Sequence, residues 1–395
     1  MKKKFLMLAI ATGLILNCTK NDEVEKQPDN NGTPPTPKGL VEAGKDYSVF
    51  PNVGGPNQPN QVYVDLSSGK TTVVKRDVWD LAFYCGDDFR VIINPAIAMT
   101  VKATEITDIT KFLAPDDKIL FTDDPKLPSQ KQISKHLIDD PRGILEADPN
   151  IKGTGTAIAQ IAANDKENKV YLLNMGNEIS TTTPEVGGVN LQGAHRGYQK
   201  IRIIRNGNGY QIQYAKNDVL ESSQIKTISI AKNSEYNFVF LNLSSGKLVD
   251  VQPKKKDWDL CFTPSTSWFS TDKVKIESLF NSASYFPDMI VTNLLGGTKA
   301  TIYQAKDKKE ETRDKDYTNY KKENALKIDF SKEKYTNQMT IGRNWRDNQG
   351  GAVLRKELYF LIKDGDGNFF KLKMTAFRND KNERGNPAFV YQLLK

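Results

Sequence analysis

The stretch VYVDLSSGKTTVVKRDVWDLAF (62–83) returns later in the chain as VFLNLSSGKLVDVQPKKKDWDLCF (239–262). Each copy contains Leu-Ser-Ser-Gly-Lys, at 66–70 and 243–247, followed by Trp-Asp-Leu-x-Phe. The second copy starts 177 residues after the first (position 243 against 66), whereas a solenoid repeat recurs every 20–50 residues or so. The repeat therefore indicates that one whole domain occurs twice.

Both copies have the residue pattern of β-strands. In the first copy, two short alternating runs flank the Leu-Ser-Ser-Gly-Lys turn, which predicts a hairpin. A second hairpin is predicted at 199–215, around an Asn-Gly turn. Helical periodicity is confined to short pieces at 129–138 and 272–281. The sequence predicts an all-β fold with two domains, at 43–223 and 224–395.

The N-terminus has the features of an export signal. Three lysines precede the apolar run FLMLAIATGLIL (5–16), which is too short to span a membrane. Residues 1–17 resemble a bacterial lipoprotein signal peptide, in which Cys18 is acylated and becomes the first mature residue. The stretch from 18 to 42 is poor in apolar residues and predicts a flexible tether. We therefore expect a lipid-anchored protein on the cell surface, at the outer membrane.

Composition and motifs exclude several function classes. The net charge is +8, but three of the lysines lie in the signal peptide and the other basic residues are interspersed with acidic ones, so we expect no nucleic-acid partner. The chain contains no Cys-x-x-Cys, His-Glu-x-x-His, Gly-x-Ser-x-Gly or Walker-type motif. We therefore expect a protein that is not an enzyme. Binding contacts are expected in segments that interrupt the β pattern, at 105–167, 177–197, 304–329 and 330–356.

The paired motifs resemble the HmuY-like family of surface lipoproteins from the Bacteroides phylum, whose characterised members bind haem. The resemblance occurs once in each copy, so the chain looks like two tandem HmuY-like domains. It implies β-rich domains with extended loops around a haem, whose iron is held by His–His or Met-containing pairs. The segments that carry the resemblance are 66–70, 79–83, 92–94, 243–247, 258–262, 359–361 and 367–372.

Haem iron is held in proteins by His, Met, Cys or Tyr side chains. The chain has two histidines, His136 and His195, and both lie in irregular segments of the first copy. If haem binds, we expect His136 as one axial ligand and either Met175 or His195 as the other. The second copy has no histidine, so it would be a weaker site or a scaffold unless Met339 substitutes.

The function expected from the sequence is haem binding for iron and haem acquisition. The partners would be haem or a haemoprotein, the membrane through the lipid anchor, and an outer-membrane receptor. The alternative is a non-enzymatic surface lipoprotein of the same fold that binds a glycan or a protein. This alternative relies on two aromatic stretches, Trp345 between two arginines and Trp268-Phe269 in a Ser/Thr-rich segment. In both copies we expect the Trp of Trp-Asp in the core and the Asp hydrogen-bonded to turn amides.

Overall fold

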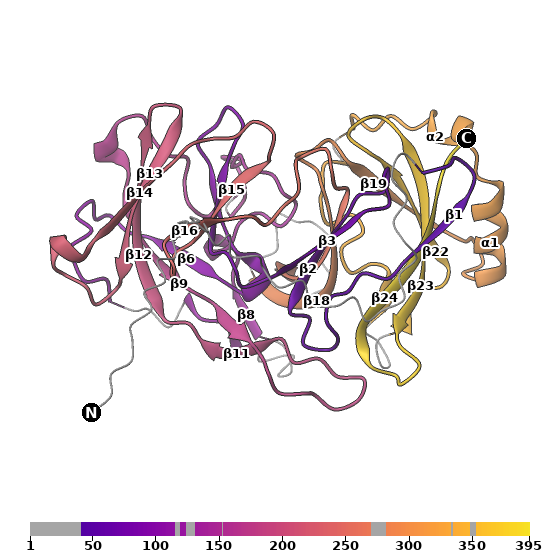
Figure 1. Ribbon diagram of the computed structural model, residues 1–395, viewed down its shortest axis with the longest axis horizontal. Coiled ribbons are helices and arrows are strands. Elements are labelled where there is room, and N and C mark those ends of the chain that lie inside the picture. The colour runs from indigo at the N-terminus through magenta and orange to yellow at the C-terminus, as the bar shows by residue number, and fades with distance from the viewer. Residues whose placement is uncertain are drawn as a thin grey trace, which may run out of the picture. The chain divides into compact units, whose positions relative to one another are not determined.

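The computed structural model describes residues 41–114, 119–123, 131–151, 153–269, 282–332, 335–347 and 353–395 (Figure 1). The described residues are predominantly antiparallel β structure, which confirms the predicted all-β fold. The predicted signal peptide, Cys18 and nearly all of the tether lie outside the described residues. Among the residues that are described, no helix has the length and apolar character needed to cross a membrane.

Two five-stranded sheets contain equivalent strands of the repeat in the same order. One runs β14-β13-β12-β9-β6 and the other β1-β24-β23-β22-β19. The strands of the first are β6 (Thr100–Ala103), β9 (Val170–Asn174), β12 (Tyr198–Asn206), β13 (Gly209–Lys216) and β14 (Lys226–Ile230). Those of the second are β1 (Asp46–Val49), β19 (Lys299–Gln304), β22 (Leu358–Lys363), β23 (Phe369–Arg378) and β24 (Arg384–Leu393).

Two further sheets have orders β16-β15-β4-β5 and β3-β2-β17-β18-β8-β7. The four-stranded one contains β4 (Leu81–Tyr84), β5 (Val91–Ile93), β15 (Phe238–Asn242) and β16 (Lys247–Val249). The six-stranded one contains β2 (Asn60–Val64), β3 (Thr71–Lys75), β7 (Thr122–Asp123), β8 (Lys131–Ser134), β17 (Leu260–Phe269) and β18 (Ser282–Thr292). Two short hairpins pair β10 (Asn177–Ile179) with β11 (Gln192–His195), and β20 (Arg346–Asp347) with β21 (Val353–Leu354).

The predicted hairpins form because apolar residues alternate along their strands. In β12, Ile201 and Ile203 are buried in one core cluster, whereas Arg202 between them points to the other face of the sheet. The turn to β13 contains Gly207, whose φ of 56° is favourable for glycine and rare for other residues. Strand β13 then pairs with β12 in continuous register from Asn206↔Gly209 to Gln199↔Lys216, so the predicted Asn-Gly hairpin is confirmed.

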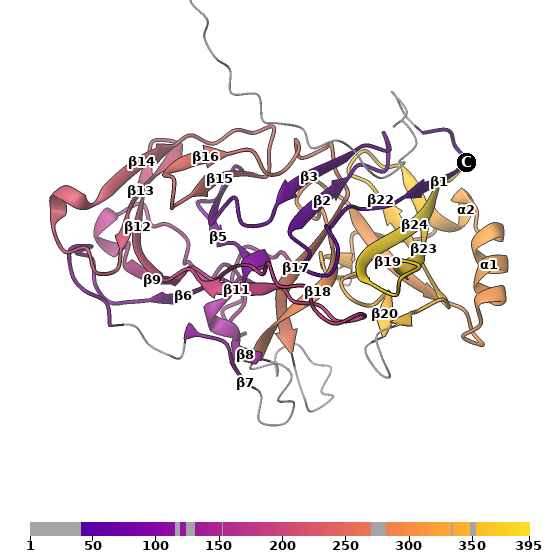
Figure 2. The ribbon, with the colours of Figure 1, turned by 60° about the horizontal axis from the view of Figure 1, so that its bottom comes forward.

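The two copies complete each other's sheets. Strand β2 of the first copy pairs with β17 of the second, with Val64 opposite Leu260. Reciprocally, β15 of the second copy pairs with β4 of the first, with Leu241 opposite Leu81. Strand β1 pairs with β24, the last strand of the chain (Figure 2). The domain boundaries 43–223 and 224–395 remain a prediction, and hydrogen-bonded sheets run across them.

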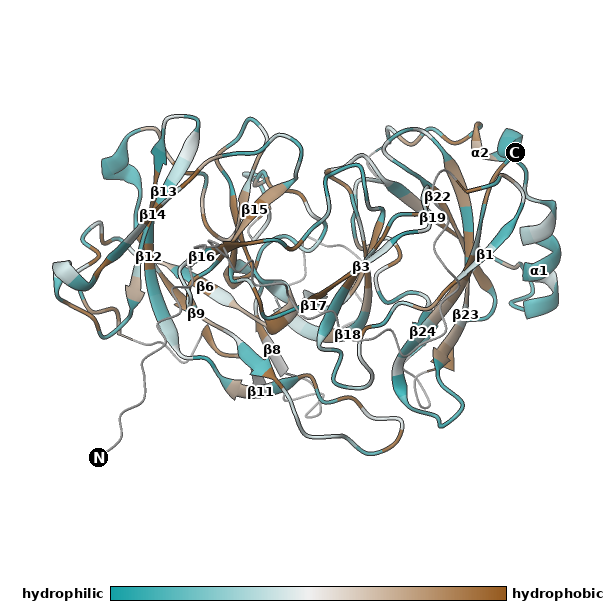
Figure 3. Cartoon of the chain, viewed as in Figure 1, coloured by the Kyte–Doolittle hydropathy of each residue, from teal (hydrophilic) through white to brown (hydrophobic). Residues whose placement is uncertain are grey.

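The helical predictions were wrong where the structure describes them. The predicted helix at 129–138 is strand β8 followed by the 3-10 helix η3 (Lys135–Leu137), and 272–281 lies outside the described residues. Helix α1 (Glu310–Asn319) and the short α2 (Lys322–Ala325) lie in a segment predicted as a loop. In α1 only Arg313 and Tyr317 are buried, so the helix has no apolar stripe that its sequence could reveal (Figure 3). The other 3-10 helices are η1 (Pro95–Ile97), η4 (Asp165–Glu167) and η5 (Ser222–Gln224).

Candidate functional site

The repeated tryptophans lie in one core cluster between the copies. Trp79 packs edge-to-face on Phe240 with ring centres 5.0 Å apart, and Trp258 packs on Tyr63 in the same way at 5.1 Å. Tyr63 and Phe240 occupy equivalent positions of the repeat, so the two pairs are equivalent and each joins one copy to the other. Both tryptophans are buried, as the sequence predicted.

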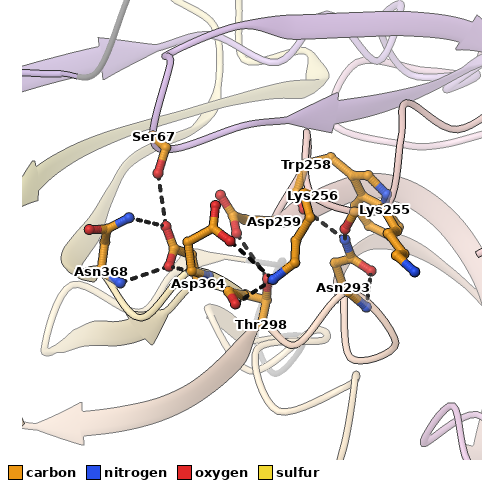
Figure 4. Close-up of polar contacts among 12 residues, drawn as sticks. Ser67, Lys255, Lys256, Trp258, Asp259, Asn293, Thr298, Asp364 and Asn368 are labelled. Carbon is orange, nitrogen blue, oxygen red and sulfur yellow. Dashed lines mark hydrogen bonds and ion pairs between the residues drawn. The ribbon is translucent and has the colours of Figure 1, made fainter. Parts of the chain in front are cut away.

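The aspartate of each Trp-Asp motif accepts a hydrogen bond from the turn of the other copy. Asp259 accepts from the backbone N–H of Leu66 at 2.9 Å. It also accepts from the Thr298 hydroxyl at 2.9 Å (Figure 4). Asp80 accepts from the backbone N–H of Leu243 at 2.7 Å. The prediction that these carboxylates bind turn amides is therefore confirmed, and the structure adds that the amides belong to the opposite copy.

The two aspartates differ in whether a basic side chain compensates the charge of the carboxylate. Asp80 forms an ion pair with Arg196 at 2.8 Å. No such pair is described for Asp259, and burial raises its pKa to about 7. Both motifs are also held by an asparagine, since Asn94 donates to the Trp79 carbonyl and Asn293 to the Trp258 carbonyl, each at 2.8 Å. These contacts are architectural.

A cavity of about 670 Å³ lies at the ends of β12 and β13, next to the segment that carries His195. Its volume is within the range of roughly 300–1,000 Å³ that small-molecule sites occupy. Three aromatic and three basic side chains line it, among other residues, so it suits a flat ligand with negative groups. We call it the Tyr198 cavity; these six residues are Phe112, Tyr198, Tyr214, Arg196, Lys216 and Lys226.

His195 lies beside this cavity. It is exposed on β11, and its ring packs edge-on against Tyr198 with centres 5.0 Å apart. Its Nε2 lies 2.8 Å from Oδ1 of Asn174, which orients the ring. Partial desolvation lowers the pKa of His195, so the imidazole stays neutral near pH 7, as a metal ligand must be.

His136 lies on a segment that contacts the same sheet. It is exposed on η3, which contacts β6 of the sheet that includes β12. The next residue, Leu137, packs against the hydrophobic cluster of Ile119 and Val170, and so does Tyr198. The structure thus places the segments that carry both histidines around one cluster, although they are far apart in the sequence.

The methionines have different surroundings. Met175 is 1% exposed and belongs to the core cluster beneath the first five-stranded sheet. Met339 is half-buried in the second copy, packs against Phe286 and Met289, and is not near the Tyr198 cavity. Among the described residues, no group of three or more His, Cys, Asp or Glu side chains is arranged to hold a metal ion.

Sequence reasoning missed the Tyr198 cavity because separate segments build it. Arg196 and Tyr198 follow His195 directly, but Phe112 and Lys226 come from distant segments and no motif connects them. In the second copy, Phe369 begins β23 as Tyr198 begins β12. There Phe369 packs with Phe330 and Leu394 in an apolar cluster.

The tryptophans that favoured a glycan or protein ligand are buried. Trp345 is 1% exposed, and its indole N–H donates to the backbone carbonyl of Asp288 at 3.0 Å. Its neighbour Arg346 pairs with the Asp288 carboxylate at 3.3 Å. Trp268 is 8% exposed beneath the guanidinium of Arg142. Neither tryptophan is available to stack on a glycan.

Comparisons with known proteins agree with the internal duplication. The model of the HmuY protein family matches two regions of the chain, 57–232 and 234–391. No curated protein sequence matches.

Several solved structures are similar to the chain. The apo HmuY analog of Tannerella forsythia is 19% identical with a TM-score of 0.18, and the match covers 50% of this chain and 96% of that one. Apo PinO from Porphyromonas gingivitis is 8% identical with a TM-score of 0.22, and the match covers 90% and 98%. An HmuY-like protein from Bacteroides vulgatus is 9% identical with a TM-score of 0.18, and the match covers 90% and 96%.

Proposed function

The chain belongs to the HmuY family, and from this premise we propose that it is a cell-surface lipoprotein that binds haem for iron and haem acquisition. Haem or a haemoprotein would be its cargo source, and an outer-membrane receptor would accept the haem. The observation that carries the proposal is that Leu137, the neighbour of His136, and Tyr198, whose ring contacts His195, pack against one hydrophobic cluster, and that Tyr198 also lines a cavity of about 670 Å³.

In this proposal the first copy holds the haem. His136 and His195 are the axial ligands, because both are exposed and His195 is held as a neutral imidazole. Lys216 and Lys226 supply positive charge for the propionates, since Arg196 is already paired with Asp80, and the aromatic side chains cover the porphyrin. His195 is preferred over Met175 as the second ligand because the thioether is buried in the core.

The second copy acts as a scaffold. It contains no histidine, and the place equivalent to Tyr198 is occupied by packed apolar side chains. One haem per chain is therefore the expected stoichiometry.

Titration of the mature chain with haemin tests the site. The expected result is a Soret band that saturates at one haemin per chain and shifts in His136→Ala and in His195→Ala. Met175→Leu is the matched control and should leave the band unchanged. A shifted band in Met175→Leu with an unchanged one in His195→Ala would assign the second axis to Met175. A protein that binds no haemin in either oxidation state would overturn the proposal.

The proposed anchor is tested separately. Cys18→Ser should abolish labelling by a fatty-acid analogue and move the protein from the detergent phase to the aqueous phase. Unaltered partition of this variant would exclude the lipid anchor and leave the haem proposal intact.

A further inference from the structure

A second, smaller cavity lies between the two copies. Its volume is about 120 Å³, and it is bordered by β2 and β15, one from each copy, and by the ends of β5 and β18. The rings of Tyr63, Trp79, Trp258, Phe238 and Phe240 line it. Half-buried residues of the loop around Leu145, together with Met339, also border it.

Buried polar groups around this cavity lack partners among the described residues. The indole N–H of Trp258 has no acceptor there, although Trp258 is only 5% exposed. The hydroxyl of Thr292, which is 2% exposed, and Oε1 of Gln252 are also unpartnered. A buried polar group without a partner costs about 1–3 kcal/mol, so three around one cavity favour an occupant that forms hydrogen bonds with them.

At the equivalent positions of the first copy, all of them among the described residues, no buried side-chain polar group lacks a hydrogen-bond partner. Trp79 donates its indole N–H to Oε1 of Gln61 at 2.8 Å. The repeat places Phe238 where Gln61 would serve Trp258. Likewise Ile93, opposite Leu81, corresponds to Thr292, opposite Leu260. The second copy has therefore lost one acceptor and gained one hydroxyl, both beside the cavity.

The size and charge of the cavity restrict its occupant. An apolar cavity of about 150 Å³ holds benzene, so 120 Å³ accommodates one small ring or a few waters. Among the described residues no lysine or arginine lines the cavity, which disfavours an anion. The carboxylates are satisfied, since Asp139 accepts from two backbone N–H groups and Asp140 pairs with Arg142 at 2.7 Å. The ligand should therefore be neutral.

We propose that this cavity binds a neutral, single-ring aromatic molecule with a hydroxyl group, of the size of phenol. Its oxygen accepts from the Trp258 indole N–H and its O–H donates to Thr292 Oγ1 or Gln252 Oε1. The ring packs among the five aromatic side chains. This site is independent of the Tyr198 cavity, which shares no lining residue with it.

Indole signals of protein labelled with 15N-tryptophan provide a direct readout, since the chain has four tryptophans. Phenol should shift the signal that Trp258→Phe removes. Benzene has the ring without the hydroxyl and should bind about tenfold more weakly, as expected for the loss of one to two net hydrogen bonds. Benzoate, the anion, should not bind.

Variants separate the site from a general effect on folding. Trp258→Phe and Thr292→Val should each reduce the preference for phenol over benzene. Trp79→Phe is the matched control, because Trp79 already has its acceptor, and it should keep the preference for phenol. The proposal is overturned if phenol shifts no indole signal, which would indicate a cavity occupied by water only. It is equally overturned if the preference for phenol is as large in Trp258→Phe as in the unsubstituted protein.

Discussion

Replacing Asp259 by alanine should loosen the junction between the copies by an amount that the hydrogen bonds define. The substitution leaves the Leu66 N–H and the Thr298 hydroxyl without their acceptor, and both residues are at most 1% exposed. Each buried unsatisfied group costs about 1–3 kcal/mol, so the free energy of unfolding should fall by roughly 2–6 kcal/mol. Asp259→Asn keeps one acceptor oxygen and should lose about half as much.

The location of the destabilised segment in Asp259→Ala tests the reasoning as well as the size of the loss of stability does. The Leu66 N–H bond adjoins the three residue pairs that join β2 to β17. Urea unfolding of Asp259→Ala should show the loss of stability, and hydrogen exchange should accelerate in 62–66 and 260–262 before the rest of the chain. A fall in the free energy of unfolding below about 1 kcal/mol, or unchanged hydrogen exchange in 62–66, would refute the reasoning that this carboxylate holds the β2–β3 hairpin against the second copy.

Three further expectations follow from the same geometry. Burial raises the pKa of Asp259 to about 7 from its ordinary value of 3.8, so between these pH values the folded state keeps a proton that the unfolded state has released. The free energy of unfolding should therefore fall as the pH rises from about 4 to about 7. Urea unfolding at several pH values measures the slope of this free energy against pH, and Asp259→Asn should reduce that slope by the equivalent of about one proton. A fragment of residues 77–255 retains every strand of the four-stranded sheet and of the first five-stranded sheet, so it should be a folded monomer by size-exclusion chromatography and circular dichroism. Residues 43–223 should be a dimer or unfolded, because β1, β2 and β4 lose their partners β24, β17 and β15. Trp345→Ala should lower the free energy of unfolding by about 3–5 kcal/mol in urea titrations, because it empties a fully buried site and removes the bond to Asp288, and a loss typical of surface substitutions would contradict this placement.

The sequence was sufficient for the fold class and for the role of the repeated motif. Alternation of apolar residues predicts the hairpins, and the Trp-Asp order predicts one buried ring and one carboxylate at a turn. It could not predict that the copies exchange strands. Leu66 and Leu243 are the same residue in the same turn, so pairing within a copy and pairing between copies would bring together identical groups. Only the path of the chain between β3 and β4 and between β16 and β17 distinguishes them.

The candidate sites were harder to predict for a different reason. The histidines are rare enough to be noticed, but the Tyr198 cavity and the inter-copy cavity are assembled from side chains far apart in the chain. No periodicity links Phe112 to Lys226, or Gln61 to Thr292. The buried position of Met175 was also beyond reach, since a methionine at the end of a strand has the same sequence context whether it faces the core or a ligand.

The duplication nevertheless indicates where function should be sought. Positions that carry the shared frame are the same in both copies, as in Asp80 and Asp259 or Asn94 and Asn293, because each copy needs the same bonds to hold its partner. Three pairs of equivalent positions that differ between the copies include residues that line the cavities, namely Gln61 and Phe238, Ile93 and Thr292, and Tyr198 and Phe369. The contacts that join the two copies occur once in each copy, so they require the same side chain at both equivalent positions. A ligand that binds to one copy requires a particular side chain at only one of the two equivalent positions. The differences between the copies, more than their likeness, therefore mark the residues whose substitution should change binding without unfolding the protein.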